Sequence, residues 1–223
     1  FLAEKLPYLR GLGTKVVVNI LGETLDEYQE LARRLGDEED VAAIEVNISC
    51  PNVKKGGVAF GTDPKMAREV TETVCRHARQ PVIVKLSPNV TDIREIAKAA
   101  EEGGAAAVSL INTLLGLAID IQSRRPKLAN IVGGLSGPAI KPIALRMVWQ
   151  TAGAVKIPVI GIGGITTAED AIEFLLAGAT AIEVGTANFI NPKATEEILD
   201  GIDNYMKCQK INSVRELIGT FTI

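Results

Sequence analysis

The sequence predicts an α/β fold of the (β/α)8 TIM-barrel kind. Short β-branched apolar runs alternate with longer amphipathic segments along the 223 residues, and this repeated β–α order requires a parallel sheet that is covered on its faces. The glycine signature of dinucleotide-binding sheets is absent after the first strand, whereas glycines cluster after the last two strands. An open doubly wound sheet could also hold six β–α units, but barrels commonly bind phosphate in their last two loops, so the glycine distribution favours a barrel.

The strands are predicted from apolar runs and the helices from apolar residues recurring every three to four positions. The expected strands are Lys15–Ile20, Ala43–Ile48, Pro81–Leu86, Ala106–Ile111, Pro158–Gly161 and Ala181–Val184. The expected helices are Leu25–Leu35, Pro64–Ala78, Ile93–Glu102, Ala139–Ala154, Ala168–Ala177 and Lys193–Lys207. The segment Asn112–Ser136 shows neither pattern, so we expect an irregular loop there and the best candidate for a mobile lid.

The position of the glycine-rich segments numbers the strands. Gly161–Ile165 and Val184–Thr186 stand where the loops after strands seven and eight of a barrel would be. The six visible strands are then strands three to eight, and the first two β–α units have no counterpart. We therefore expect residues 1–223 to form a single domain, the C-terminal three quarters of a barrel.

Composition and charge narrow the class of protein. The net charge of −3 and the pI near 5.4 give no electrostatic basis for binding nucleic acid or an anionic membrane. No apolar stretch reaches the roughly 20 residues that span a bilayer, and no signal-peptide pattern opens the chain, so a cytoplasmic location is predicted. Three widely spaced cysteines imply neither a disulfide framework nor a metal site.

Polar residues at the ends of the apolar strands are the first candidates for a functional site. Asn19, Asn47, Lys85, and Asn112 with Thr113 fall at four such ends, which meet on one side of a parallel barrel. Asparagine is common wherever a strand turns, so their coincidence carries more weight than any one of them. A lysine that snorkels to the rim is one interpretation of Lys85; the favoured one is a cation that stabilises negative charge on a reduced cofactor ring such as a flavin.

The late glycines are candidates for a phosphate site. Gly163-Gly164 and Gly185-Thr186 offer unobstructed backbone N–H groups, with helices expected at about Thr167 and Pro192. Turns alone would be equally glycine-rich, and only the pairing on two late strands raises the odds of a phosphate cradle. The segment from Gly133 to Pro138 adds a third glycine-rich helix entrance, which suits close approach to a flat ligand.

Cys50 is the candidate reactive group. It stands between Asn47 and Asn52 and precedes Pro51, which biases it toward an extended backbone. As a thiolate, a cysteine can move a proton, while amides on either side can bind the N–H and C=O groups of a planar ring. The following segment Val53–Thr62 is glycine-rich, and is expected to be either a loop that closes over a substrate or a plain surface loop.

These residues together resemble the dihydroorotate dehydrogenases, flavin-dependent barrel enzymes of pyrimidine synthesis, along essentially the whole chain. The cysteine of Ser49-Cys50-Pro51-Asn52 is similar to that of the soluble class 1, and Val53-Lys54-Lys55-Gly56-Gly57 is similar to the NAD-linked (1B) subtype. The other motifs that carry the resemblance are Val84–Leu86, Asn112-Thr113, Gly134–Pro142, Gly161–Ile165 and Gly185-Thr186.

The resemblance implies an oxidoreductase that converts dihydroorotate to orotate for UMP synthesis. Cys50 would remove the C5 proton as general base, and the C6 hydrogen would pass as hydride to FMN. The implied substrate-binding residues are Asn47, Asn52, Asn112 and Thr113. The implied FMN-binding residues are Asn19, Asn47, Lys85, Ile111, Gly137, Gly163, Gly164, Gly185 and Thr186.

The resemblance also implies a partner. In the NAD-linked subtype, electrons leave through a second subunit that carries FAD and an iron–sulfur cluster, and two copies of each subunit form a heterotetramer around a homodimer. The three scattered cysteines here could not hold that cluster, so it is expected on the partner. The alternatives are another FMN barrel that acts on a dihydropyrimidine, and a flavin-binding fragment without activity.

Overall fold

Six parallel strands form the sheet that organises the molecule. The computed structural model describes residues 1–49 and 57–222, without the side chains of residues 57–59. The strands follow one another in the order β1-β2-β3-β4-β9-β10: β1 (Val16–Ile20), β2 (Val41–Asn47), β3 (Val82–Lys85), β4 (Ala107–Leu110), β9 (Val159–Ile162) and β10 (Ala181–Glu183). All neighbours pair in parallel. The six predicted strands are confirmed, with ends that differ by at most two residues.

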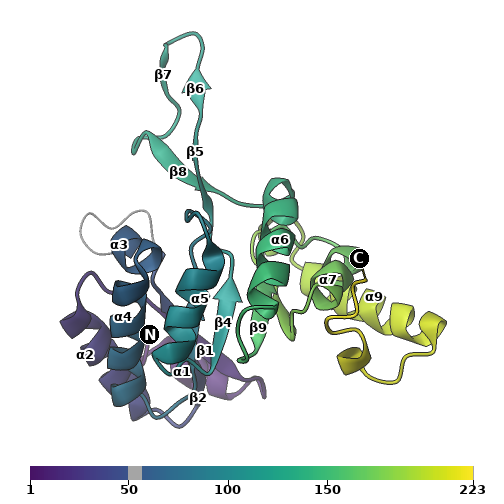
Figure 1. Cartoon of the computed structure of the whole chain (residues 1–223), viewed down its shortest axis with the longest axis horizontal. Coiled ribbons are helices and arrows are strands. Elements are labelled where there is room, and N and C mark those ends of the chain that lie inside the picture. The colour runs from purple at the N-terminus through teal and green to yellow at the C-terminus, as the bar shows by residue number, and fades with distance from the viewer. Residues whose placement is uncertain (50–56, 223) are drawn as a thin grey trace.

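Helices follow the strands and pack beside one another in sequence order. They are α1 (Lys5–Arg10), α2 (Leu25–Gly36), α3 (Gly57–Thr62), α4 (Pro64–His77), α5 (Ile93–Glu102), α6 (Lys141–Ala152), α7 (Ala168–Leu176), α8 (Ala187–Ile190) and α9 (Ala194–Gln209). The larger ones contact in the succession α2, α4, α5, α6, α7, α9, as Figure 1 shows. Side chains of Thr24, Asp63, Asp92 and Thr167 cap α2, α4, α5 and α7, so short polar residues fix where these helices begin.

The two faces of the sheet differ in what they bury. Ile44, Val84 and Val108 belong to the main apolar core, whereas the alternate residues Ala43, Ile83 and Ala107 form a separate small cluster with Ile160. Because side chains alternate across a strand, the two clusters lie on opposite faces of the sheet. The sheet curls so that the helices cover its outer face and the small cluster lies on the narrow inner face. This is a TIM-barrel type of fold, in which β1 and β10 are the two edges of the curled sheet.

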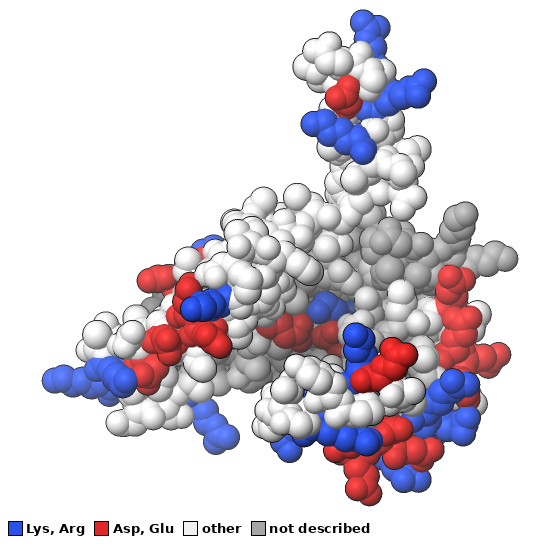
Figure 2. Space-filling model, turned by 180° about the vertical axis from the view of Figure 1, so that it is seen from behind, with Lys and Arg blue, Asp and Glu red and all other residues white. Residues whose placement is uncertain are grey.

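The segment after β4 is a projecting β arm, and the expectation of an irregular loop over Asn112–Ser136 is wrong. Strand β5 (Leu114–Leu117) pairs antiparallel with β8 (Val132–Leu135), and β6 (Ile119–Asp120) pairs with β7 (Arg125–Pro126). The arm stands away from the helices in Figure 1, and Figure 2 shows basic side chains near its tip. Its strands are short and rich in glycine, so cross-strand pairing, rather than local sequence pattern, creates the structure.

Two further expectations about loops need correction. Residues Gly57–Thr62 form α3, so that part of Val53–Thr62 is helical, while residues 53–56 lie outside the described part of the chain. Gly133 and Gly134 lie in β8 and not at a helix entrance; only Gly137 directly precedes the 3-10 turn Pro138–Ile140 that leads into α6. In the described ranges, no helix is both long and apolar enough to cross a membrane.

Candidate active site

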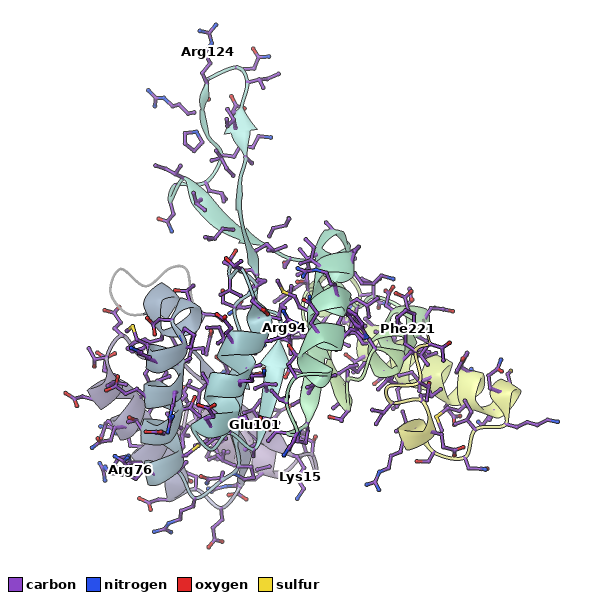
Figure 3. The ribbon with its side chains drawn as sticks, viewed as in Figure 1. Lys15, Arg76, Arg94, Glu101, Arg124 and Phe221 are labelled. Atoms are coloured by element: carbon purple, nitrogen blue, oxygen red, sulfur yellow. The ribbon has the colours of Figure 1, made fainter. Side chains whose placement is uncertain are left out.

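A layer of polar side chains lies on the inner face of the sheet, one step beyond the small apolar cluster. Residues 43, 45 and 47 of β2 share that face, and in the parallel register Asn19 of β1 is opposite Glu45. Asn47 is opposite Lys85, and Lys85 is opposite Ser109 of β4. The strands therefore bring Asn19, Glu45, Lys85 and Ser109 from distant parts of the sequence into one layer near their carboxyl ends, with Asn47 one step above Glu45 on β2. In Figure 3, Lys15, just before β1, lies at the opposite end of the molecule from Arg124 on the arm.

Glu45 is the centre of this layer. Its Oε2 accepts a hydrogen bond from Asn19 Nδ2 at 2.5 Å, and its Oε1 accepts one from Ser109 Oγ at 2.5 Å. Burial by itself raises the pKa of Glu45, but the charge of Lys85 and the bonds from Ser109 and Asn19 outweigh burial, so the net pKa lies below its usual value. Glu45 is therefore held as a carboxylate although its side chain is only 8% exposed.

Lys85 joins two carboxylates. Its Nζ lies 3.5 Å from Glu45 Oε2 and 3.1 Å from Glu183 Oε2 of β10. Burial raises the pKa of Glu183, and the nearby charge of Glu45 raises it further. A buried ammonium group needs an anionic partner, and here the protein itself supplies two.

A second polar layer lies above the first and fixes three amide and hydroxyl side chains. Asn47 Oδ1 accepts hydrogen bonds from Ser49 Oγ at 3.1 Å and from Asn112 Nδ2 at 3.1 Å. Asn112 Nδ2 also donates to Ser49 Oγ at 2.6 Å, and its Oδ1 accepts from the backbone N–H of Thr113 at 2.7 Å. Tyr28 OH donates to the backbone oxygen of Asn47 at 2.8 Å. Each amide is thereby held in one orientation.

A pocket opens over these layers between β3, β4, β9 and β10. It encloses about 520 Å³ of empty space, open solvent included. Its lining combines the cation Lys85 and the acid Glu183 with glycine-containing turns that expose their backbone. The lining residues are Lys85, Ile111, Asn112, Thr113, Ser136, Gly137, Ile140, Ile162, Gly163, Gly164, Ile165, Thr166, Glu183, Gly185, Thr186 and Ala187.

The glycines of this pocket are there for two different reasons. Gly164 has φ +80°, and a Cβ there would lie 2.8 Å from the backbone nitrogen of Lys141, so backbone conformation and packing both require glycine. Gly185 has no such constraint, because a Cβ there would meet nothing closer than 4.0 Å. Packing within the protein does not explain the absence of a side chain at Gly185, whereas room for a ligand does.

Most of the predicted site residues come together in this pocket. Those that line it are Lys85, Ile111, Asn112, Thr113, Gly137, Gly163, Gly164, Gly185 and Thr186. Asn47 reaches it through its bond to Asn112, while Asn19 lies beneath it, bonded to Glu45. Cys50 and Asn52 lie outside the described residues. The helix expected at about Pro192 is confirmed as α9, which begins at Ala194, and a further short helix, α8, starts directly after Thr186.

Sequence reasoning missed three members of the site. The apolar runs that predict the strands contain Glu45, Ser109 and Glu183, and none of the three is predicted as a site residue. Glu45 nevertheless lies two residues after Ala43 and two before Asn47. That alternation could have placed Glu45 on the same face as Asn47. For Glu183 the signal was weaker, because only its position just before Gly185-Thr186 on a short strand pointed to the site.

Comparison with known proteins decides the family. The sequence profile described as dihydroorotate dehydrogenase matches residues 3–206. The chain belongs to the dihydroorotate dehydrogenase family. The resemblance carried by the strand-tip and glycine motifs is thus confirmed, and with it the class of FMN-dependent oxidoreductase that defines this family.

Relatives in the dihydroorotate dehydrogenase family are similar over nearly the whole chain. The chain is 62% identical over 219 residues to the catalytic subunit of dihydroorotate dehydrogenase B (NAD(+)) from Alkaliphilus oremlandii, and 61% identical to that from Geotalea uraniireducens; each match covers 98% of this chain and 72% of the relative. The crystal structure of a family member from Eimeria tenella in complex with ferulenol superposes with a TM-score of 0.74 at 25% identity. That match covers 91% of this chain and 61% of the other.

Proposed function

We propose that this protein oxidises dihydroorotate to orotate in de novo pyrimidine (UMP) synthesis, as a catalytic subunit of the NAD-linked type. The observation that carries the proposal is the pocket in which Lys85, Asn112 and Thr113 face the glycine turns of β9 and β10. The high identity to catalytic subunits of that name supports the same assignment. In this proposal residues 1–223 are one FMN-binding barrel domain. The six strands β1, β2, β3, β4, β9 and β10 correspond to strands three to eight of the barrel.

FMN fits the pocket as its cofactor. The open space at Gly185 and the backbone N–H groups around Gly163, Gly164 and Thr186 suit the phosphate, and Lys85 suits the ring. The proposed FMN-binding residues are Asn19, Asn47, Lys85, Ile111, Gly137, Gly163, Gly164, Gly185 and Thr186, with Asn19 acting through Glu45. When bound, the flavin supplies a two-electron acceptor beside the substrate.

The substrate is assigned to the amide layer. The bonds that Asn47 Oδ1 accepts hold its carbonyl end against Ser49 and Asn112, which leaves the other end of the amide to face a substrate ring. We assign Asn47, Asn112, Thr113 and Asn52 to substrate binding. Cys50, as general base, takes the C5 proton while the C6 hydrogen leaves as hydride.

Anaerobic stopped-flow reduction of the bound flavin by dihydroorotate tests the proposal. The parent protein is expected to bleach the flavin absorbance, and Cys50→Ala is expected to lower the rate at neutral pH by about 10²–10⁴-fold, as for loss of a general base. Cys208→Ala is the matched control, because Cys208 is an exposed cysteine on α9. Parent-like reduction by Cys50→Ala would exclude Cys50 as the base.

Two alternatives give distinct outcomes in the same experiment. Faster reduction by dihydrouracil than by dihydroorotate would indicate another FMN barrel acting on a dihydropyrimidine, since only dihydroorotate offers a carboxylate. Failure to bind FMN at all would favour a fragment without activity.

The partner is tested separately. We assign electron transfer to NAD to a second subunit with FAD and an iron–sulfur cluster, arranged around a homodimer in a heterotetramer. Co-purification with such a subunit should confer NAD reduction on a protein that otherwise only reduces its own flavin. NAD reduction without the partner would argue against this arrangement.

A further inference from the structure

We propose that Glu183 is the charge-balancing residue of the flavin site: it takes up one proton from solvent when the site gains the negative charge of the hydride. This inference rests on the proposed function, because it requires a hydride acceptor in the pocket. It adds a residue and a proton that the assignments above do not contain.

The charges around Lys85 do not balance. One ammonium group serves two carboxylates, with Nζ at 3.5 Å from Glu45 Oε2 and 3.1 Å from Glu183 Oε2. The side chains of Lys85 and Glu45 are 14% and 8% exposed, so solvent screens this pair poorly, whereas Glu183 is 32% exposed and is the member that solvent reaches. With both acids ionised, the cluster already carries one net negative charge before any hydride arrives.

The two acids are unequally supported. Glu45 also accepts hydrogen bonds from Asn19 and Ser109, which stabilise it as a carboxylate. Glu183 accepts a hydrogen bond from Lys85, interacts otherwise with the Glu45 carboxyl, and lines the pocket itself. A proton entering the cluster therefore goes to Glu183, and burial together with the charge of Glu45 raises the pKa of Glu183 accordingly.

Proton uptake by Glu183 would balance the charge that the hydride adds. A hydride carries two electrons and one proton, so its arrival adds one negative charge to the cofactor. Uptake of one solvent proton by the Glu183 carboxylate gives a neutral acid and restores the net charge of the site. Among the described residues, the charged groups that act on Glu183 are Glu45 from β2 and Lys85 from β3.

The midpoint potential of the bound flavin, measured against pH by spectroscopic titration, tests the inference. The slope for a two-electron couple changes by about 30 mV per pH unit for each proton taken up. We expect the parent to show one proton more than Glu183→Gln across the neutral range. Glu183→Asp, which keeps the carboxylate, should restore the parent's slope with its breakpoint at a different pH.

Glu173→Gln is the matched control, since Glu173 also pairs with a lysine but lies away from the pocket; its slope should equal the parent's. Equal slopes in the parent and Glu183→Gln would overturn the inference, even if the potential itself moved. If Glu183→Gln does not retain flavin, an unmoved breakpoint in Glu183→Asp overturns it instead. Absence of flavin reduction by dihydroorotate in the parent would count against the proposed function, which separates the two failures.

Discussion

The protein contains two clusters, each of one lysine and two acids, in which the acids behave differently. Lys85 pairs with Glu45 and Glu183 inside the sheet, and Lys141 of α6 pairs with Asp170 and Glu173 of α7 outside it, at 2.7 and 3.0 Å. In each, one acid accepts hydrogen bonds from several donors besides the lysine, and the second acid is bonded by the lysine. The side chain of the second acid is 44% exposed in the outer cluster and 32% exposed in the inner one, where it lines a pocket.

The comparison shows that the hydrogen bonds an acid accepts, and not its exposure alone, decide its charge state, because Asp170 is 13% exposed and Glu183 is 32% exposed. In the outer cluster, burial alone would raise the pKa of Asp170, but the bonds from Lys141 and Thr166 outweigh it and lower the pKa to about 2. The hydrogen bond to Asp170 raises the pKa of Lys141. In the inner cluster the opposite result appears at Glu183, whose pKa is raised by burial and by Glu45. The outer cluster joins α6 to α7, while the inner one contains a carboxylate, Glu183, that can take up a proton.

Removal of the lysine should separate the clusters most strongly. Lys85→Met leaves two acids without a cation, and we expect the free energy of unfolding to fall by about 3–5 kcal/mol. Lys141→Met should lower it by less, because Glu173 is 44% exposed and Asp170 keeps its hydrogen bonds from Thr166 and Thr167. Urea unfolding of both variants measures this contrast. Equal losses would mean that the inner cluster is as well solvated as the outer one.

Removal of a hydroxyl donor should have the next largest effect. Ser109 is buried and bonds Glu45 at 2.5 Å, so Ser109→Ala should lower the free energy of unfolding by about 1.5–3 kcal/mol. Thr166→Ala removes a bond of 2.8 Å to Asp170 in the outer cluster. It should have a smaller effect, because Thr166 is only half-buried. A larger loss of unfolding free energy for Thr166→Ala than for Ser109→Ala would show that hydrogen bonds to the acid matter more in the outer cluster than in the inner one.

Asp170 should determine part of the acid limb of stability. Its folded pKa of about 2 lies below the ordinary 3.8, so it adds stability above about pH 4 that disappears as the pH falls toward 2. The contribution is on the order of 2 kcal/mol. Asp170→Asn should lose this amount at neutral pH and show a flatter acid limb in urea titrations. An unchanged acid limb would exclude Asp170 as its source.

Glu183→Gln should change stability least, and it should raise stability where the other substitutions lower it. A raised pKa means that ionising Glu183 destabilises the folded state, and this penalty grows as the pH rises from the unfolded pKa through the folded one. The flavin-free variant should therefore have an equal or higher thermal midpoint than the parent at neutral pH. A clear fall in the midpoint would show that the carboxylate contributes to stability, and not chiefly to the site.

Strands and helices were predictable because their signals are local. The run Val82-Ile83-Val84 predicts a strand without its neighbours, and the caps at Thr24 and Thr167 lie beside the helices they begin. The β arm was not predictable in this way, since Leu114–Leu117 becomes a strand only by pairing with Val132–Leu135. Pairing across many residues leaves no local period to detect.

The sequence by itself determined the order of strands and helices, the polar strand tips and the family, because each depends on neighbouring residues or on short motifs. The tertiary structure decided which polar groups share a charge. Glu45, Lys85 and Glu183 are separated by 40 and 98 residues, and only the curled sheet brings their side chains within 3.5 Å of one ammonium group. Charge and pKa depend on distance and solvent access in three dimensions, which strand alternation can suggest and only packing fixes.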